Sequence, residues 1–303
     1  MKNKIIVEEK YATLRIDKLL TLFNENYSRA YFSNLIKSGN VTVNDKNISP
    51  SYKVKSGDVI DILMTEKESN LPLKPYELEL DIMYEDDDIL VINKPAGLVV
   101  HPGDGHHDDT LVNALLYNQK ELSTVNGLHR VGIVHRIDKD TSGLLLICKN
   151  DFAHNEIAKQ LKDHSMHREY IALVDGSIDV NSGVIRGKIG RDSTNRLKMA
   201  INNQSGKEAV THFKVLERFE KYTLIECVLE TGRTHQIRVH MSSIGHPLVG
   251  DKLYGGSTYI YKAGQLLHAY KLTFYHPTLK KEISLECKIP NYFEEILNKL
   301  RLA

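Results

Sequence analysis

Apolar positions in the first 64 residues recur at helical spacing and then alternate. Ser28 suits the N-cap of the second of two short helices and Gly39 suits its end. Alternation then predicts strands over residues 41–43 and 54–63. We therefore predict a small α/β module over residues 1–64, with its core at about 13–64. The helical positions are Ile16, Leu19, Leu20 and Phe23, followed by Tyr31, Phe32, Leu35 and Ile36.

The pattern weakens after Met64 and then changes. Residues 65–76 combine charges, prolines and weak periodicity, which predicts a linker. Helical spacing beyond it predicts helices at 110–117 and at 151–163, the latter capped by Asp151. Many short strands with few helices predict an α+β domain over residues 77–303, built on a largely antiparallel sheet. The predicted strands cover residues 78–83, 89–93, 144–148, 170–174, 222–229 and 272–274.

Composition narrows the class of protein. At 303 residues, with 41% apolar and 26% charged residues, the chain is long enough for two folded domains. No apolar run approaches the roughly 20 residues of a membrane span, so we expect a cytoplasmic protein without a membrane partner. Cys148, Cys227 and Cys287 lie far apart without a CxxC spacing, and we interpret them as small core residues. A net charge of +1 means that any surface for nucleic acid must be local.

The polar positions of the N-terminal module carry basic residues. Taken alone, these basic residues can also be explained as solvated charges on short helices. The order of motifs, however, resembles the S4 RNA-binding domain, which implies that the second helix and the following turn contact phosphates of a structured RNA. The motifs are Arg15 of Arg-x-Asp-x-x-Leu, Ser28-Arg29, Ile36, residues 39–44 and Gly57 to Ile60. The expected RNA-binding residues here are Arg15, Lys18, Arg29 and Lys37.

Several familiar enzymatic motifs are missing from the sequence. It has no GxxxxGK[ST] loop, no GxGxxG after a strand, no Gly-x-Ser-x-Gly elbow and no HExxH. The run His106-His107-Asp108-Asp109 is better explained as a hydrated loop, because adjacent residues seldom converge on one metal ion. We therefore expect no metal, no nucleotide and no other cofactor.

The stretch VHRIDKDTSGLLLI places charged residues directly before an aliphatic strand. A carboxylate such as Asp138 at the end of a buried strand tends to be protonated unless a guanidinium stabilises its charge. Such a group can attack a sugar anomeric carbon or accept a proton. A structural ion-pair network among Arg136, Asp138, Lys139 and Asp140 explains the same residues, and residue types alone leave both interpretations open.

A second polar stretch lies at residues 229–255. It brings Arg233, His235, Arg238 and His240 together, which we interpret as a polar strand end that faces RNA phosphates. A surface strand with solvated cations is the alternative. A metal site is not supported, since the histidines lack carboxylate or cysteine neighbours.

Residues 130–150 closely resemble the signature of the RluA-type pseudouridine synthases, His-Arg-Leu-Asp followed by Thr-Ser-Gly-Leu-Leu. The match extends over nearly all of residues 77–290, and with the S4-like module in front it is similar to the RluD-like subgroup, which modifies large-subunit ribosomal RNA. Three small departures are Ile137 for leucine, Asp109 for glycine and Lys188 for proline. The further matching segments are Asn93 to Pro102, Arg168 to Gly176, Ile189-Gly190-Arg191, Gly232 to His240 and Leu267-His268-Ala269.

The resemblance implies isomerisation of a uridine within RNA, in which the N1–C1′ bond breaks and the uracil rejoins through C5. It implies that Asp138 acts on the ribose, as nucleophile or as base. Tyr170 would pack on the uracil, and Arg233 would pair with the aspartate. The base must be flipped out of its stack, and Arg136 would fill the vacated space. His135 and Arg238 are the other residues expected to face the RNA.

The expected partner is large-subunit ribosomal RNA or a ribosome-assembly intermediate, bound by a monomer. Three alternatives remain open: a transfer-RNA pseudouridine synthase, a catalytically silent ribosome-assembly factor that binds RNA, and a metal-dependent RNA hydrolase that uses the histidines.

Overall fold

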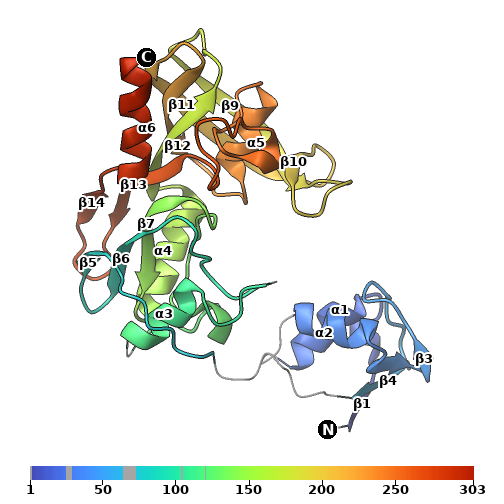
Figure 1. Cartoon of the computed structure of the whole chain (residues 1–303). Coiled ribbons are helices and arrows are strands. Elements are labelled where there is room, and N and C mark those ends of the chain that lie inside the picture. The colour runs from blue at the N-terminus through green and yellow to red at the C-terminus, as the bar shows by residue number, and fades with distance from the viewer. Residues whose placement is uncertain (1, 25–28, 64–72, 104, 120) are drawn as a thin grey trace. The chain divides into compact units, whose positions relative to one another are not determined.

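The computed structural model describes residues 2–24, 29–63, 73–103, 105–119 and 121–303 (Figure 1). The chain divides into two compact units, Met1–Pro72 and Leu73–Ala303. The boundary falls within the predicted linker, whose residues 65–72 lie outside the described residues, as does the predicted N-cap Ser28.

The N-terminal unit packs two helices on a sheet with strand order β1-β4-β2-β3. The helices bury most of the predicted apolar positions, such as Leu19 and Phe32, against Ile60 and Ile62 of the sheet, whereas Phe23 is 42% exposed. Asn44 and Asp45 both have positive φ, 48° and 59°, as a tight two-residue hairpin requires. Strand β1, which the sequence pattern did not indicate, pairs antiparallel with β4. The elements are β1 (Lys2–Ile6), η1 (Glu9–Tyr11), α1 (Ile16–Phe23), α2 (Arg29–Lys37), β2 (Val41–Val43), β3 (Lys46–Asn47) and β4 (Val59–Leu63).

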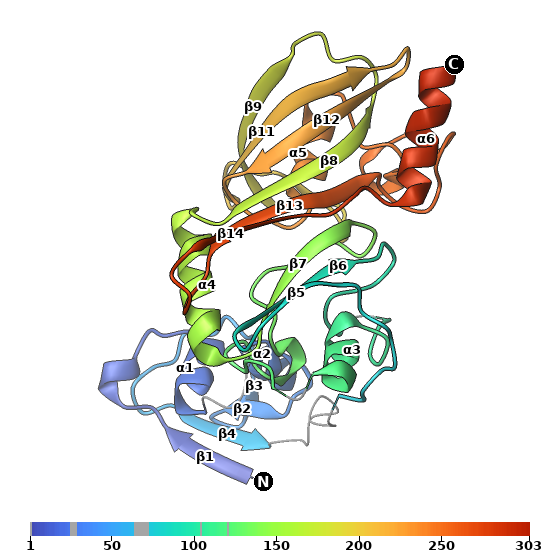
Figure 2. The same ribbon diagram turned by 90° about the vertical axis from the view of Figure 1, so that its left-hand side faces the viewer.

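The second unit is built on one sheet, to which the described residues contribute ten strands. Their order is β10-β9-β11-β12-β8-β13-β7-β6-β5, with β14 paired to β13 (Figure 2). Among the strands that the structure describes, only β13 and β7 pair in parallel, so the predicted α+β fold with a largely antiparallel sheet is confirmed. The strands are β5 (Ile82–Glu85), β6 (Ile89–Lys94), β7 (Ser142–Cys148), β8 (His167–Asp175), β9 (Ser182–Arg191), β10 (Met199–Ile201), β11 (Lys207–Arg218), β12 (Tyr222–Leu229), β13 (Leu267–Tyr275) and β14 (Glu282–Glu286).

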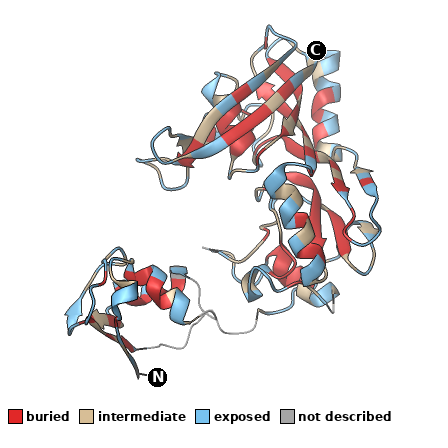
Figure 3. Ribbon diagram, turned by 180° about the vertical axis from the view of Figure 1, so that it is seen from behind, coloured by how far each residue is buried: buried red, intermediate tan, exposed pale blue. Residues whose placement is uncertain are grey.

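Helices cover both faces of this sheet, because successive strand residues point to opposite sides. On β7, Leu144 and Leu146 pack toward α4, whereas Leu145 and Ile147 pack toward α3. On β12, Ile225, Cys227 and Leu229 belong to the core under α5, whereas Leu224 belongs to the core under α6. Figure 3 shows buried residues along the strands and on the inner faces of the helices. The helices are α3 (Leu111–Asn118), η3 (Leu128–Arg130), α4 (Asp151–Asp163), α5 (Gln236–Ser243), η4 (Lys252–Tyr254) and α6 (Asn291–Leu302).

Three local predictions were wrong. The strand predicted over residues 78–83 is displaced, since β5 covers Ile82–Glu85. Asn150, not Asp151, caps α4, since its Oδ1 accepts the Ala153 N–H at 2.9 Å. Residues 236–243 form helix α5 and not a strand end. Their buried face includes Arg238 and His240, so it carries no apolar stripe that would signal a helix. Within the described residues, no helix has both the length and the apolar character needed to cross a bilayer.

Candidate active site

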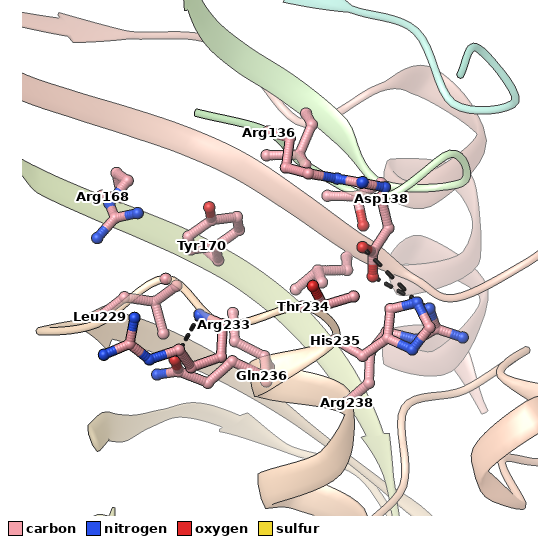
Figure 4. Close-up of a pocket in the computed structure, with 15 residues that line it drawn as sticks. Arg136, Asp138, Arg168, Tyr170, Leu229, Arg233, Thr234, His235, Gln236 and Arg238 are labelled. Atoms are coloured by element: carbon pink, nitrogen blue, oxygen red, sulfur yellow. Dashed lines mark hydrogen bonds and ion pairs between the residues drawn. The ribbon is translucent and has the colours of Figure 1, made fainter. Parts of the chain in front are cut away.

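A pocket of about 110 Å³ opens on the α5 face of the sheet, which is too small for a drug-sized ligand. Four parts of the chain, far apart in sequence, form it (Figure 4). Four arginines and a single aspartate lie along it, so its lining is cationic. The lining residues are 136–138, Thr141, Arg168, Tyr170, Leu229, 232–238 and Leu267.

Asp138 lies in the turn that leads into β7, with 15% of its side chain exposed. Ile137 anchors this turn to the protein core, because its side chain is buried in the hydrophobic cluster that includes residues of α5. The Thr141 N–H donates to the Asp138 carbonyl at 3.1 Å and closes the turn. Gln265 Nε2 donates to Thr141 Oγ1 at 3.0 Å in a buried contact. The carboxylate therefore projects from a backbone that is held on two sides.

Lys94 fastens a second loop to the same turn. Its side chain is fully buried, and Nζ donates to the carbonyls of Pro95, Leu98 and Lys139 at 2.7, 2.9 and 3.0 Å. The Gly97 N–H donates to the same Lys139 carbonyl at 2.9 Å. Burial lowers the pKa of Lys94 to about 7. The Lys94-Pro95-Ala96-Gly97 loop thus supports the residue that follows Asp138.

A close backbone contact explains why residue 143, in the Thr-Ser-Gly stretch, is a glycine. It lies beside Ala269 where β7 meets β13, with φ of 112°. A Cβ at this position would lie 2.2 Å from the Ala269 carbonyl oxygen. Only glycine permits this approach, which brings β7 and the preceding turn against β13.

The ionic partner of Asp138 is Arg238. Arg238 Nη1 donates to Asp138 Oδ2 at 3.0 Å. Its Nε and Nη2 donate to the two oxygens of Asp251 at 2.6 and 2.9 Å, and Asp251 is 2% exposed. Burial opposes the charge of Arg238, but the hydrogen bonds and charges of these two carboxylates outweigh it and raise the arginine pKa. A single guanidinium therefore joins Asp138 to a buried second carboxylate.

The predicted pairing of Arg233 with the aspartate was therefore wrong, while a contact of Arg238 with RNA stays a prediction. Arg233 Nε donates to the Glu208 carbonyl at 2.9 Å, at the other side of the pocket (Figure 4). Arg233 belongs to the loop before α5, whereas Arg238 is in its first turn, and long helical side chains lean toward the helix N-terminus. This geometry directs Arg238 at Asp138 and leaves 9% of its side chain exposed.

His235 lies next to the same carboxylate. Its Nε2 is 3.9 Å from Asp138 Oδ1, and its Nδ1 is 2.8 Å from the Tyr254 hydroxyl. Its backbone is left-handed, with φ of 57°, because it turns the chain into α5. Burial lowers the pKa of His235, so the ring is neutral at pH 7. The sequence did not indicate Asp251 and Tyr254 as members of this cluster, since neither stands in a motif with Asp138.

Tyr170 occupies the floor of the pocket from β8, with 6% of the residue exposed. Burial raises the pKa of its hydroxyl, which is therefore protonated at neutral pH. The ring presents an apolar face in the same cavity as the Asp138 carboxylate.

Arg136 and His135 differ in environment. Arg136 is exposed at the pocket rim, and its Nη1 is 3.4 Å from His101 Nε2. His135 Nε2 accepts the backbone N–H of Leu146 at 3.0 Å, and burial lowers the pKa of its ring to about 3. His135 is thus a neutral side chain that holds β7 through this hydrogen bond. The contact is a structural one, whereas we had expected His135 to contact RNA.

Two of the basic residues of the N-terminal unit share one carboxylate. Arg15 Nη2 and Arg29 Nε lie 2.9 and 3.0 Å from Asp17 Oδ2, and the Asp17 side chain is 5% exposed. Burial alone would raise the pKa of Asp17, but the hydrogen bonds from both arginines outweigh it and lower the pKa. Lys18 and Lys37 are exposed on the same two helices.

One group of potential metal ligands exists among the described residues, namely Asp86, Asp88 and His276. The His276 ring is 2.7 Å from Asp86 Oδ2 through Nε2, while its Nδ1 accepts the backbone N–H groups of Thr278 and Leu279. Both ring nitrogens are therefore already used within the protein, which makes this a structural cluster.

Comparison with known proteins identifies the class. Residues 88–243 match the RNA pseudouridylate synthase family, and residues 14–60 match the S4 domain. The chain belongs to this family of RNA-modifying isomerases and carries an RNA-binding S4 domain in front.

Individual relatives cover nearly the whole chain. An uncharacterized RNA pseudouridine synthase, YlyB, of Bacillus subtilis is 46% identical over 98% of this chain and 97% of that protein. Ribosomal large subunit pseudouridine synthase D of Neisseria meningitidis serogroup B is 45% identical over 95% of this chain and 79% of that protein. Among solved structures, human RNA pseudouridylate synthase domain containing 1 is 26% identical, with a TM-score of 0.56 over 76% of this chain and 98% of that one.

Proposed function

We propose that this protein converts a specific uridine of large-subunit ribosomal RNA into pseudouridine, with Asp138 as the catalytic residue. The observation that carries the proposal is the Asp138 carboxylate, 15% exposed in a small cationic pocket and 3.0 Å from a guanidinium. The guanidinium orients the carboxylate in the pocket, and a positioned carboxylate can attack a ribose or accept its proton.

The pocket supports a division of roles. Asp138 meets the ribose, either by attack on C1′ or by removal of a ribose proton, while the uracil packs on the ring of Tyr170. Arg238 orients the carboxylate through its hydrogen bond to Oδ2, the position that the resemblance had given to Arg233. His235, neutral and beside Asp138, adds a polar neighbour without adding charge.

A uridine in a paired stack cannot reach Asp138, so the proposal includes base flipping, at a cost of a few kcal/mol. Arg136 is the candidate to fill the vacated space, because it is exposed at the rim two residues before Asp138. Its planar guanidinium can stack on the neighbouring bases.

The catalytic role is tested with Asp138→Asn, which preserves size and removes the charge. Conversion of a ribosomal RNA transcript is measured by carbodiimide adducts and primer extension, with Arg301→Gln, on the exposed face of α6, as a matched control. We expect no conversion by Asp138→Asn and normal conversion by the control. Full conversion by Asp138→Asn would refute the role of Asp138.

Two other functions are weighed against the ribosomal one. A silent assembly factor is disfavoured by the intact arrangement of Asp138, Arg238 and Tyr170. A transfer-RNA enzyme is disfavoured by the S4 unit, together with the relatives named for the ribosomal large subunit. Deletion of residues 1–72 should weaken binding and modification of ribosomal RNA while a short stem-loop is still modified. Equal modification of ribosomal RNA without the unit would overturn the assignment.

A further inference from the structure

Arg168 is a buried cation without an ionic partner in the pocket. It lies on β8, two residues before Tyr170, and is 7% exposed. Its Nε is buried and has no hydrogen-bond partner. Over the described part of the chain, no carboxylate lies within ion-pair distance of it, whereas Arg238 in the same pocket has two.

The surroundings of Arg168 fix its position. Gly232 passes so close that a Cβ there would lie 2.4 Å from Arg168 Nη1. Burial lowers the pKa of Arg168, but a guanidinium remains charged at neutral pH. A buried charge without a partner is unfavourable for folding, so this arrangement suits a group whose partner comes with the ligand.

Arg168 and Asp138 lie on opposite sides of Tyr170. Residues 168 and 170 share one face of β8, and Figure 4 shows Tyr170 between Arg168 and Asp138. A nucleoside with its ribose at Asp138 and its ring on Tyr170 would extend the far edge of the base toward Arg168. On uracil that edge carries carbonyl oxygens, which are hydrogen-bond acceptors.

We propose that Arg168 donates to a carbonyl oxygen of the target uracil and stabilises the negative charge of the ring during catalysis. The inference rests on the proposed role of Asp138 at the ribose. When the N1–C1′ bond breaks, its electron pair stays on the uracil and spreads over N1 and the carbonyl oxygens. The C5–C1′ bond then forms, C5 loses its proton and N1 gains one, so that no co-reactant is needed. A guanidinium beside the carbonyl stabilises this anion in a site with little water.

The same contact selects the base. Arg168 has only donors, so it matches a carbonyl and opposes the amino group that cytosine carries at C4. A phosphate is the competing anion, but phosphates follow the strand outside a base pocket. Arg136, exposed at the rim, is better placed for a phosphate than Arg168, which is 7% exposed.

The test uses Arg168→Gln and Arg168→Lys in the full-length protein, under single-turnover conditions. Loss of the target nucleoside is followed by nuclease digestion and mass spectrometry, with either uridine or 5-fluorouridine at the target position. Fluorine withdraws electrons and stabilises the uracil anion, so the 5-fluorouridine substrate depends less on a cation. We expect Arg168→Gln to slow the reaction of uridine roughly 10- to 100-fold and that of 5-fluorouridine clearly less. Arg168→Lys should recover part of the rate.

Further substitutions identify the contact. Target nucleosides with sulfur in place of O2 or O4 accept hydrogen bonds weakly. One of the two sulfur substitutions should slow the wild type but should not slow Arg168→Gln any further. This result indicates that the sulfur and the Arg168→Gln change remove the same hydrogen bond. The melting temperature of Arg168→Gln should not fall, because the residue has no protein partner to lose. A fall in melting temperature together with equal fold losses for uridine and 5-fluorouridine would overturn the proposal in favour of a structural role.

An RNA with a neutral methylphosphonate linkage beside the target nucleotide tests the alternative that Arg168 binds a phosphate. If the loss caused by Arg168→Gln disappears on that RNA, Arg168 binds a phosphate and the inference is wrong. Activity of Asp138→Asn would instead refute the proposed function. Arg301→Gln serves again as a control that removes an arginine far from the pocket.

Discussion

The position of Arg238 between two carboxylates gives a prediction with separable effects on stability and activity. The variant Arg238→Gln removes the cation 3.0 Å from Asp138 and leaves Asp251, 2% exposed, without its bidentate partner. Breaking a buried ion pair from one side costs about 3–5 kcal/mol. For a unit of this size, roughly 2–4 °C per kcal/mol predicts a melting temperature lower by roughly 6–20 °C.

The double variant Arg238→Gln/Asp251→Asn separates the two effects. It removes the uncompensated buried carboxylate and restores an amide pair, so we expect it to regain most of the lost stability. We do not expect it to regain activity, because Asp138 still lacks its guanidinium. At least a 10²-fold loss of turnover is consistent with the role of one preorganised electrostatic contact.

The assay combines thermal unfolding with single-turnover conversion of ribosomal RNA across pH. Both variants should be slower than the wild type throughout that pH range, since the guanidinium that orients the Asp138 carboxylate is gone. Arg233→Gln is the comparison, as it changes a pocket arginine that bonds to the Glu208 carbonyl. A wild-type rate and profile in Arg238→Gln, with both lost in Arg233→Gln, would refute the assignment of Arg238 as the partner.

Two further predictions concern buried charges outside that contact. Lys94→Met leaves the carbonyls of Pro95, Leu98 and Lys139 without their donor, so turnover should fall and the free energy of unfolding at pH 7 should drop by roughly 2–4 kcal/mol. The pKa of Lys94 is about 7 in the fold, below its unfolded value, so the unfolded chain binds more protons above pH 7. Wild-type stability should therefore rise from about pH 7 toward about pH 10, and denaturant unfolding should find this slope reduced in Lys94→Met but not in the exposed Lys139→Met. Asp17 has its pKa lowered in the fold, so its contribution is present above about pH 4 and lost as pH falls below it. Hydrogen exchange of residues 16–23 in the full-length chain should show that Asp17→Asn weakens α1 at pH 7 and removes this acid dependence, whereas unchanged exchange would contradict the ion-pair account.

The hydrophobic pattern predicted elements with long aliphatic runs, whereas the amphipathic helix α6 was not predicted. Strand β7 and its neighbour β6 alternate between the cores under α3 and α4, and both were found by their aliphatic runs. Helix α5 was missed because its buried residues include Arg238 and His240. These side chains are stable inside only because Asp251 and Thr211 meet them from elsewhere in the chain.

The resemblance of residues 130–150 to a family signature led to Asp138 without a structure, because such a signature is a local pattern. The identity of its partner is not local. Arg233 and Arg238 are both arginines of one short segment, and the direction of the helix that begins at Gln236 decides which of them reaches Asp138.

By itself, the sequence determined the class of the protein, its two-part organisation and the candidate carboxylate, since periodicity and motif spacing are properties of the chain. The tertiary structure decided which charges are compensated: Asp138 by Arg238, Asp17 by Arg15 and Arg29, and Arg168 by no carboxylate among the described residues. The physical reason is that compensation depends on distances of about 3 Å between segments remote in sequence, and only the packing of β7, β8 and α5 sets those distances.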